Sequence, residues 1–216
     1  MKLVIQLLLW IVIIFLGYMV FDSVYEPVQF NQVKEKRYQK VIEKLNDIRD
    51  AEMAYRDVTG KFTGSFDELV RFIDTAKFTI TQRRDTTVLD EEFQRIYKVD
   101  KYVEQVVIDT LGFASVKDSL FGGSDRYKTM MKVPVEGVDA EFELDAGTVT
   151  KNETEIPVFE AKVAKEVLLH DQDPDLVVLE KQVISVDQIP GAYVKVGSME
   201  EVKTAGNWPK TYGDNE

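Results

Sequence analysis

Residues 38–58 read YQKVIEKLNDIRDAEMAYRDV, and their apolar side chains recur at intervals of three and four residues. In an α-helix this spacing places the apolar side chains on one face, while Lys44, Asp47 and Arg49 fall largely off it. The pattern predicts an amphipathic helix of about seven turns over residues 32–58. Its apolar stripe consists of Tyr38, Val41, Leu45, Ile48, Ala51, Tyr55 and Val58.

This stripe allows two interpretations. Most amphipathic helices cover a sheet of their own domain, which is the interpretation that we favour. Alternatively, the stripe is a face for a partner or for copies of the same chain. A long coiled coil is not supported, because Glu52 falls where the heptad seam should continue after Ile48. The candidate partner face consists of Tyr38, Val41, Leu45, Ile48 and Tyr55.

The next segment, DVTGKFTGSFDELV at residues 57–70, invites comparison with a phosphate-binding loop. That motif requires a glycine five residues before Gly60 and a hydroxyl directly after the lysine. The chain has Tyr55 and Phe62 at these positions. A connector between two helices is therefore favoured over a nucleotide site.

Both ends of this connector carry helix signals. Gly60 suits the left-handed residue that closes a helix. Ser65 and Glu68 form S-x-x-E, the capping box that begins one. We expect a helical hairpin over residues 32–76, with these three residues in structural roles.

Residues 3–21, LVIQLLLWIVIIFLGYMVF, carry no charged side chain. As a helix they would extend about 28 Å, close to the thickness of a bilayer's hydrocarbon core. The competing interpretation is a cleaved signal peptide, but the flank lacks a convincing small-x-small cleavage site. We expect an uncleaved, single-pass anchor over residues 1–22. A joint over residues 23–31 should follow, because Pro27 disfavours a continuous helix.

Two rules conflict on the orientation of this anchor. Lys2 precedes the apolar segment and Glu26 follows it, which favours a cytoplasmic amino terminus. A count of nearby basic residues favours the opposite orientation. We expect the inner (cytoplasmic) membrane with an extracytoplasmic head. The basic residues that oppose this are Lys34, Lys36, Arg37 and Lys40.

Residues 77–216 change to an alternation of period two, which is typical of half-buried strands. We expect one hairpin from residues 103–109 and 113–116, and the turn of another at residues 145–147. Helices followed by antiparallel strands indicate an α+β domain, with the long amphipathic helix and a short helix packed on the sheet. Residues 32–216 should therefore form a single head, helical over 32–76 and β-rich over 77–216.

Composition limits the chemistry available. A net charge of −11 opposes nucleic-acid binding, and the absence of cysteine excludes thiol nucleophiles and zinc–thiolate sites. His170 is the only histidine and lacks an identifiable nucleophile. Asp173 before Pro174 indicates a helix start, although the run Asp171, Asp173, Asp175 also begins like a calcium loop, a question left open. We expect no catalytic, cofactor or metal site.

The order of an amino-terminal apolar helix, an amphipathic helix, a loop and antiparallel strands is similar to that of type IV pilins and pseudopilins. Ala54-Tyr55-x-Asp57-x-x-Gly60-x-Phe62 resembles the end of the long helix in major pseudopilins, although the chain lacks a prepilin-peptidase site. Segments such as GKFTGSFDELV and GNWPKTYGD also resemble uncharacterised single-pass envelope proteins of bacteria. The anchor, together with a folded head that has no assembled catalytic group, favours a non-enzymatic subunit of a secretion, pilus-like or motility assembly. Such a subunit would contact lipid through its anchor and proteins or its own copies through its head. The alternative is a membrane-tethered sensor or ligand-binding domain.

Overall fold

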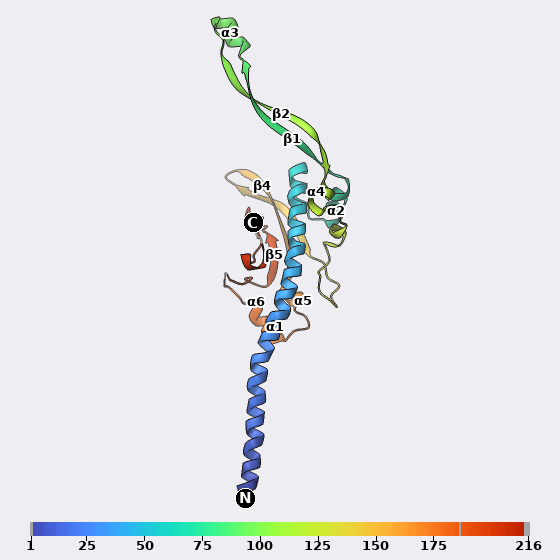
Figure 1. Cartoon of the computed structure of the whole chain (residues 1–216), viewed down its shortest axis with the longest axis vertical. Coiled ribbons are helices and arrows are strands. Elements are labelled where there is room, and N and C mark those ends of the chain that lie inside the picture. The colour runs from blue at the N-terminus through green and yellow to red at the C-terminus, as the bar shows by residue number, and fades with distance from the viewer. Residues whose placement is uncertain (1, 186, 214–216) are drawn as a thin grey trace.

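The computed structural model describes residues 2–185 and 187–213, and its architecture is α+β with a long amino-terminal helix and antiparallel sheets (Figure 1). The sheets are a three-stranded one within the head and a two-stranded ribbon that projects from it. The elements are α1 (Lys2–Thr59), α2 (Phe66–Thr75), β1 (Lys77–Leu89), α3 (Glu91–Tyr97), β2 (Tyr102–Ser115), α4 (Val116–Phe121), η1 (Arg126–Thr129), β3 (Glu143–Lys151), β4 (Thr154–Ala164), α5 (Lys165–Leu168), α6 (Pro174–Lys181), β5 (Tyr193–Gly197) and η2 (Lys210–Tyr212).

Helix α1 runs without interruption through Pro27, so the joint predicted over residues 23–31 does not exist in the structure. Proline in a helix interior is unfavourable by about 3 kcal/mol, because it removes one backbone hydrogen bond and crowds the preceding turn. Two contacts between side chains one turn apart lie near the proline, one spanning it and one just before it. Gln29 donates from Nε2 to the Tyr25 hydroxyl at 2.6 Å, and Phe21 stacks on Tyr25 with 5.3 Å between ring centroids. The anchor segment and the head therefore share one helix.

Gly60 ends α1 as predicted, with φ of +81° and its N–H donating to the Arg56 carbonyl at 2.7 Å. The capping box was wrong. Ser65 occupies the position before α2, but its side chain makes no capping bond. Glu68 instead accepts from the Thr63 hydroxyl at 2.8 Å, and that hydroxyl accepts from the Ser65 N–H at 3.2 Å. Thr63, whose N–H donates to the buried Glu52 carboxylate of α1, thus connects Glu68 to the backbone of Ser65.

The three-stranded sheet has the order β3-β4-β5, and all its neighbours are antiparallel. The turn predicted at residues 145–147 was wrong, because these residues lie inside β3 and pair with β4. The true turn is Asn152-Glu153, where both residues have positive φ, 51° and 64°. This is the backbone of a tight two-residue hairpin turn, which matches the twist of its strands. The strand therefore continues beyond the glycine that suggested a turn.

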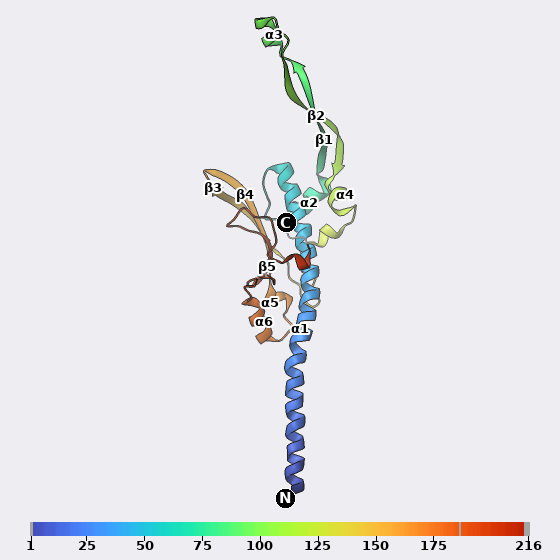
Figure 2. The ribbon, with the colours of Figure 1, turned by 60° about the vertical axis from the view of Figure 1, so that its left-hand side comes forward.

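The ribbon pairs β1 with β2 along their whole length, and short helix α3 closes its tip. The hairpin predicted within residues 103–116 was wrong, because residues 103–115 belong to the continuous strand β2 and Val116 begins α4. Ile80 pairs with Gly112 and Thr81 with Thr110, so one extra residue, Leu111, is absorbed as a β-bulge. In Figures 1 and 2 the ribbon extends past the end of α1, away from the amino terminus.

The core lies between the carboxy-terminal half of α1 and the inner face of the three-stranded sheet, with α2 and α4 beside α1. The side chains that α1 contributes include most of the predicted stripe. Tyr55 is half-buried, and its ring meets that of Phe72 at 5.0 Å between centroids. The proposed partner face is thus occupied by the protein's own core. Fully or almost fully buried are Tyr38, Val41, Leu45, Ile48, Phe159, Ala161, Val194, Val196 and Trp208.

A matched pair of valines on α1 tests this arrangement. Val41 is fully buried, whereas Val58 is 49% exposed. We expect Val41→Ala to lower the free energy of unfolding by about 2–3 kcal/mol, because it removes buried methyl groups and leaves a cavity. Val58→Ala should change it by less than about 0.5 kcal/mol. Denaturant titration of the full chain in detergent would measure both, and equal effects would contradict the assigned core.

Candidate functional site

The acidic run at residues 171–175 and His170 lie at the surface of the head. His170 is exposed just after α5. Asp171 forms a bidentate pair with Arg37 of α1, at 2.6 and 2.7 Å, and this guanidinium holds the pKa of Asp171 well below its usual range. Asp173 caps α6 by accepting from the N–H groups of Asp175 and Leu176 at 2.9 and 3.1 Å. Within the described residues no group of three or more histidine, aspartate or glutamate side chains could hold a metal ion.

Two buried lysines of the head meet at the buried Glu180 of α6. Lys34 of α1 donates to Glu180 Oε2 at 2.9 Å, and Lys165 of α5 donates to Oε1 at 3.1 Å. The Tyr38 hydroxyl also donates to Oε1, at 3.2 Å. Lys165 completes its bonds with the backbone carbonyls of Glu180 and Ile189, at 2.8 and 2.7 Å. We call Lys34, Tyr38, Lys165 and Glu180 the Glu180 cluster.

Burial dominates the electrostatics of this cluster. It lowers the pKa of Lys165, and the nearby Glu180 carboxylate counteracts part of that change. Burial together with the same carboxylate raises the pKa of Tyr38 far above its ordinary value, so the phenol stays protonated. One carboxylate thus holds two buried ammonium groups and a phenol. The cluster fastens α5 and α6 to α1.

A cavity of about 510 Å³ opens beside the cluster, with Lys34 in its lining. The lining is polar and of mixed charge, with Glu35 and Asp187 as its acidic members. The remaining side chains are Asn31, Gln39, Gln188, Thr211 and Tyr212. A lining that offers both hydrogen-bond donors and acceptors suits a small polar ligand better than an apolar one.

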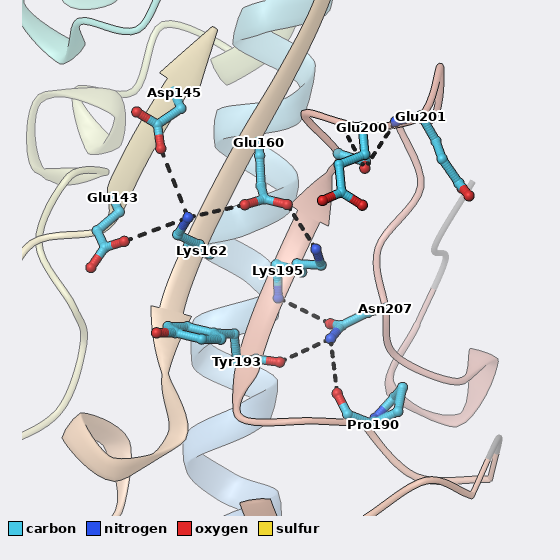
Figure 3. Close-up of polar contacts among 11 residues, drawn as sticks. Glu143, Asp145, Glu160, Lys162, Pro190, Tyr193, Lys195, Glu200, Glu201 and Asn207 are labelled. Carbon is cyan, nitrogen blue, oxygen red and sulfur yellow. Dashed lines mark hydrogen bonds and ion pairs between the residues drawn. The ribbon is translucent and has the colours of Figure 1, made fainter.

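The outer face of the three-stranded sheet carries a second charge network (Figure 3). Lys162 Nζ lies 3.1 Å from Glu160, 3.7 Å from Glu143 and 3.8 Å from Asp145, and Lys195 donates to Glu160 at 2.7 Å. Burial opposes ionisation of Glu160, but the hydrogen bonds from Lys195 and Lys162 outweigh it and lower its pKa. Every charge in this network has an opposite neighbour, as on the solvated face of an antiparallel sheet.

Asn207 fixes the chain that follows β5 (Figure 3). Its Oδ1 accepts from the Lys195 N–H at 3.0 Å, and its Nδ2 donates to the carbonyls of Tyr193 and Pro190 at 2.8 and 3.4 Å. The amide therefore takes the place of a further strand at this edge. Its role is structural.

Glu52 of α1 is a buried acid with no cationic partner among its described bonds. Its Oε2 accepts from the Thr63 N–H at 3.0 Å, while its Oε1 has no hydrogen-bond partner. Burial raises the pKa of Glu52 to about 8, against the opposing effect of the Thr63 bond. At neutral pH this carboxyl is therefore largely protonated.

Sequence reasoning missed both Glu180 and Glu52. A signal existed for the first: Lys165 interrupts the apolar positions that flank it in VAKEVLL, where a lysine needs a buried anion. Its partner lies 15 residues later, and nothing in the sequence identifies it. Glu52 was noted only as a break in the heptad.

Comparisons with known proteins found no relative of this chain. No family model matches the chain, and no significant match was found among curated proteins or solved structures. The residues and contacts described above therefore carry the functional argument.

Two glutamate-to-glutamine substitutions test how much the Glu180 cluster contributes to the stability of the protein. Glu180→Gln leaves two buried ammonium groups without a carboxylate, and we expect it to destabilise the protein by about 3–5 kcal/mol. The control is Glu166→Gln, which breaks the exposed pair with Lys181 (2.8 Å) and should have a much smaller effect. Thermal and denaturant unfolding would measure both. Similar small effects would show that the cluster does not hold the helices together.

Glu52 predicts a pH dependence of stability. Its folded pKa, about 8, lies above the ordinary 4.5, so the folded state binds more protons than the unfolded state between these values. Stability should fall as pH rises through this window, by at most about 1.4 kcal/mol per pH unit. Glu52→Gln should remove that component and stabilise the protein above about pH 8. Unfolding free energies measured at about pH 5, 7 and 8.5 would check this, and identical profiles for both proteins would contradict it.

Proposed function

We propose that the protein is a single-pass membrane protein whose head makes protein contacts as a structural or interaction subunit of an envelope assembly. The observation that carries this proposal is the continuity of α1. Its amino-terminal part has no buried residue in its most apolar 18-residue window, whose mean hydropathy is 2.7, and the same helix then becomes the central helix of the head. This geometry suits a protein that holds its head at a fixed position above a bilayer.

The anchor segment supports lipid contact through its side chains. The large apolar side chains of residues 3–21 are 44–75% exposed, which is costly in water and favourable in hydrocarbon. The Glu180 cluster lies shortly after this segment, because Lys34 and Tyr38 belong to the same helix. The base of the head is thereby fixed to the helix just outside the proposed bilayer.

The opposite end of the molecule supports protein contact. The ribbon carries exposed apolar side chains, among them Ile108 and Phe113, which are 65% and 69% exposed. Several charged groups of the head, such as Arg37 and Lys162, are by contrast engaged in the ion pairs described above. The surface best suited to a protein partner is therefore the ribbon, which lies farthest from the amino terminus (Figure 1).

A membrane-tethered sensor or ligand-binding head is the second candidate. The observation that favours it is the polar cavity beside Lys34, which lies against α1. A ligand there would contact both the central helix and the segment around Asp187 and Gln188. A thermal-shift screen of small polar metabolites would detect such a ligand by stabilisation that Gln39→Ala weakens.

Anchoring and orientation can be tested with single cysteines, because the chain has none of its own. We expect Glu153→Cys, at the exposed β3–β4 turn, to react with a membrane-impermeant maleimide in intact cells or spheroplasts. The control Lys2→Cys should react only after the cells are lysed. Both variants should remain in the membrane pellet after alkaline extraction. The reverse labelling pattern would contradict the orientation, and release into the supernatant would contradict the anchor.

A further inference from the structure

The ribbon is an incomplete sheet. It consists of β1 and β2 alone, and in the described part of the chain neither outer edge has a neighbouring strand. Isolated two-stranded ribbons are marginally stable in water, and their free N–H and C=O groups attract further strands. A ribbon of this length thus presents two edges that a third strand can join.

The two edges carry opposite charge. Strand β1 has three basic residues and one acidic residue, giving a charge of +2, whereas β2 has two acidic residues and no basic one, giving −2. The chain already uses this complementarity internally, because Arg84 and Asp109 pair at 2.5 Å. A β1 edge therefore attracts a β2 edge and repels another β1 edge. The residues are Lys77, Arg83, Arg84 and Asp85 on β1, and Glu104 and Asp109 on β2.

Strand β2 also exposes apolar side chains on one face of the ribbon. Tyr102, Val106 and Ile108 alternate along the strand and are 64%, 45% and 65% exposed. Their partners across the ribbon, Leu89, Asp85 and Arg83, only partly cover them. A strand added at the β2 edge would bury part of this surface.

Membrane anchoring limits how two copies can meet. The ribbon projects from the end of the molecule opposite the amino terminus, roughly along α1 (Figures 1 and 2). Copies anchored in one membrane therefore have parallel ribbons. Antiparallel pairing of two β2 edges would place the anchors at opposite ends, and parallel pairing would set acidic strands side by side. Pairing of β1 with a neighbour's β2 is antiparallel and keeps the anchors on one side.

We infer that a second copy of this chain completes the ribbon, with the β1 edge of one copy paired to the β2 edge of the next. The interface is head-to-tail, so a pair of copies still has one free β1 edge and one free β2 edge for further copies. The head is broader than the ribbon (Figures 1 and 2). Two ribbons can therefore come close enough to pair as strands only in the part that extends beyond the heads. A head-to-tail interface of this kind forms a ring when the rotation between successive copies closes. This inference rests on the proposed membrane anchor, which fixes the common polarity.

Cysteine crosslinking tests the pairing directly in membranes. Thr86 and Gln105 face each other within the ribbon, and both are exposed. A chain with Thr86→Cys and a differently tagged chain with Gln105→Cys are co-expressed at full length and treated with a short bismaleimide. We expect the mixed dimer at a yield severalfold above either same-site dimer. A dominant same-site dimer, equal yields of all three or recovery of monomer alone would overturn the inference.

Two controls keep the outcome interpretable. The double variant Thr86→Cys/Gln105→Cys should crosslink within one chain, which shows that the ribbon is folded. Arg83→Glu should reduce the mixed dimer severalfold, whereas Lys151→Glu, the same charge change at the end of β3, should leave it unchanged. Equal effects of the two reversals would also overturn the charge-directed pairing. Chains that stay in the membrane pellet without a mixed dimer refute the pairing alone, and chains absent from the pellet refute the anchor.

Discussion

Removal of one face of α1 from water is the constraint on which the rest of the structure depends. The helix gives the head its central element, and the sheet, α2 and α4 gather around it because its apolar stripe must be covered. The same helix continues into the exposed apolar segment at the amino terminus. Position of the head relative to that segment is therefore set by helical geometry rather than by a flexible linker.

Ion pairs reinforce this arrangement by holding the short helices α5 and α6 against α1. The Glu180 cluster joins α5 and α6 to the helix, and the Arg37–Asp171 pair lies close to it. A buried cluster of this kind adds less net stability than specificity, because an alternative packing would leave an ammonium group without its anion. The acidic run that resembled a calcium loop has a structural role here, because Asp171 pairs with Arg37 of α1 and Asp173 caps α6.

The sequence predicted the parts that depend on local chemistry. The α+β class, the end of the long helix at Gly60 and the helix start at Asp173 follow from periodicity and from residue types that few other conformations accept. Pro27 misled because its penalty is small beside the preference of a long flanking helix to continue. The turns at residues 110–112 and 145–147 misled because glycine permits a turn without requiring one. The Glu180 cluster was out of reach, since its members are brought together by tertiary packing.

The ribbon also could not be predicted in full from the sequence. Its strands were recognised in part, but their isolation from the head sheet has no local signal, because alternation looks the same in a ribbon and at a sheet edge. Only the three-dimensional arrangement reveals that the chain extends two complementary edges away from its core. The fold thus places the exposed apolar amino-terminal segment and the ribbon at opposite ends of the molecule.

The continuity of α1 through Pro27 is the central claim, and a distance between two spin labels tests it most directly. With labels at Ser23→Cys and Lys40→Cys in the full chain reconstituted in liposomes, the two sites are 17 residues apart. A continuous helix predicts a single narrow distance distribution near ~25 Å, from a rise of about 1.5 Å per residue. A broad distribution, or one centred well below this value, would show a joint at the proline and would contradict the account.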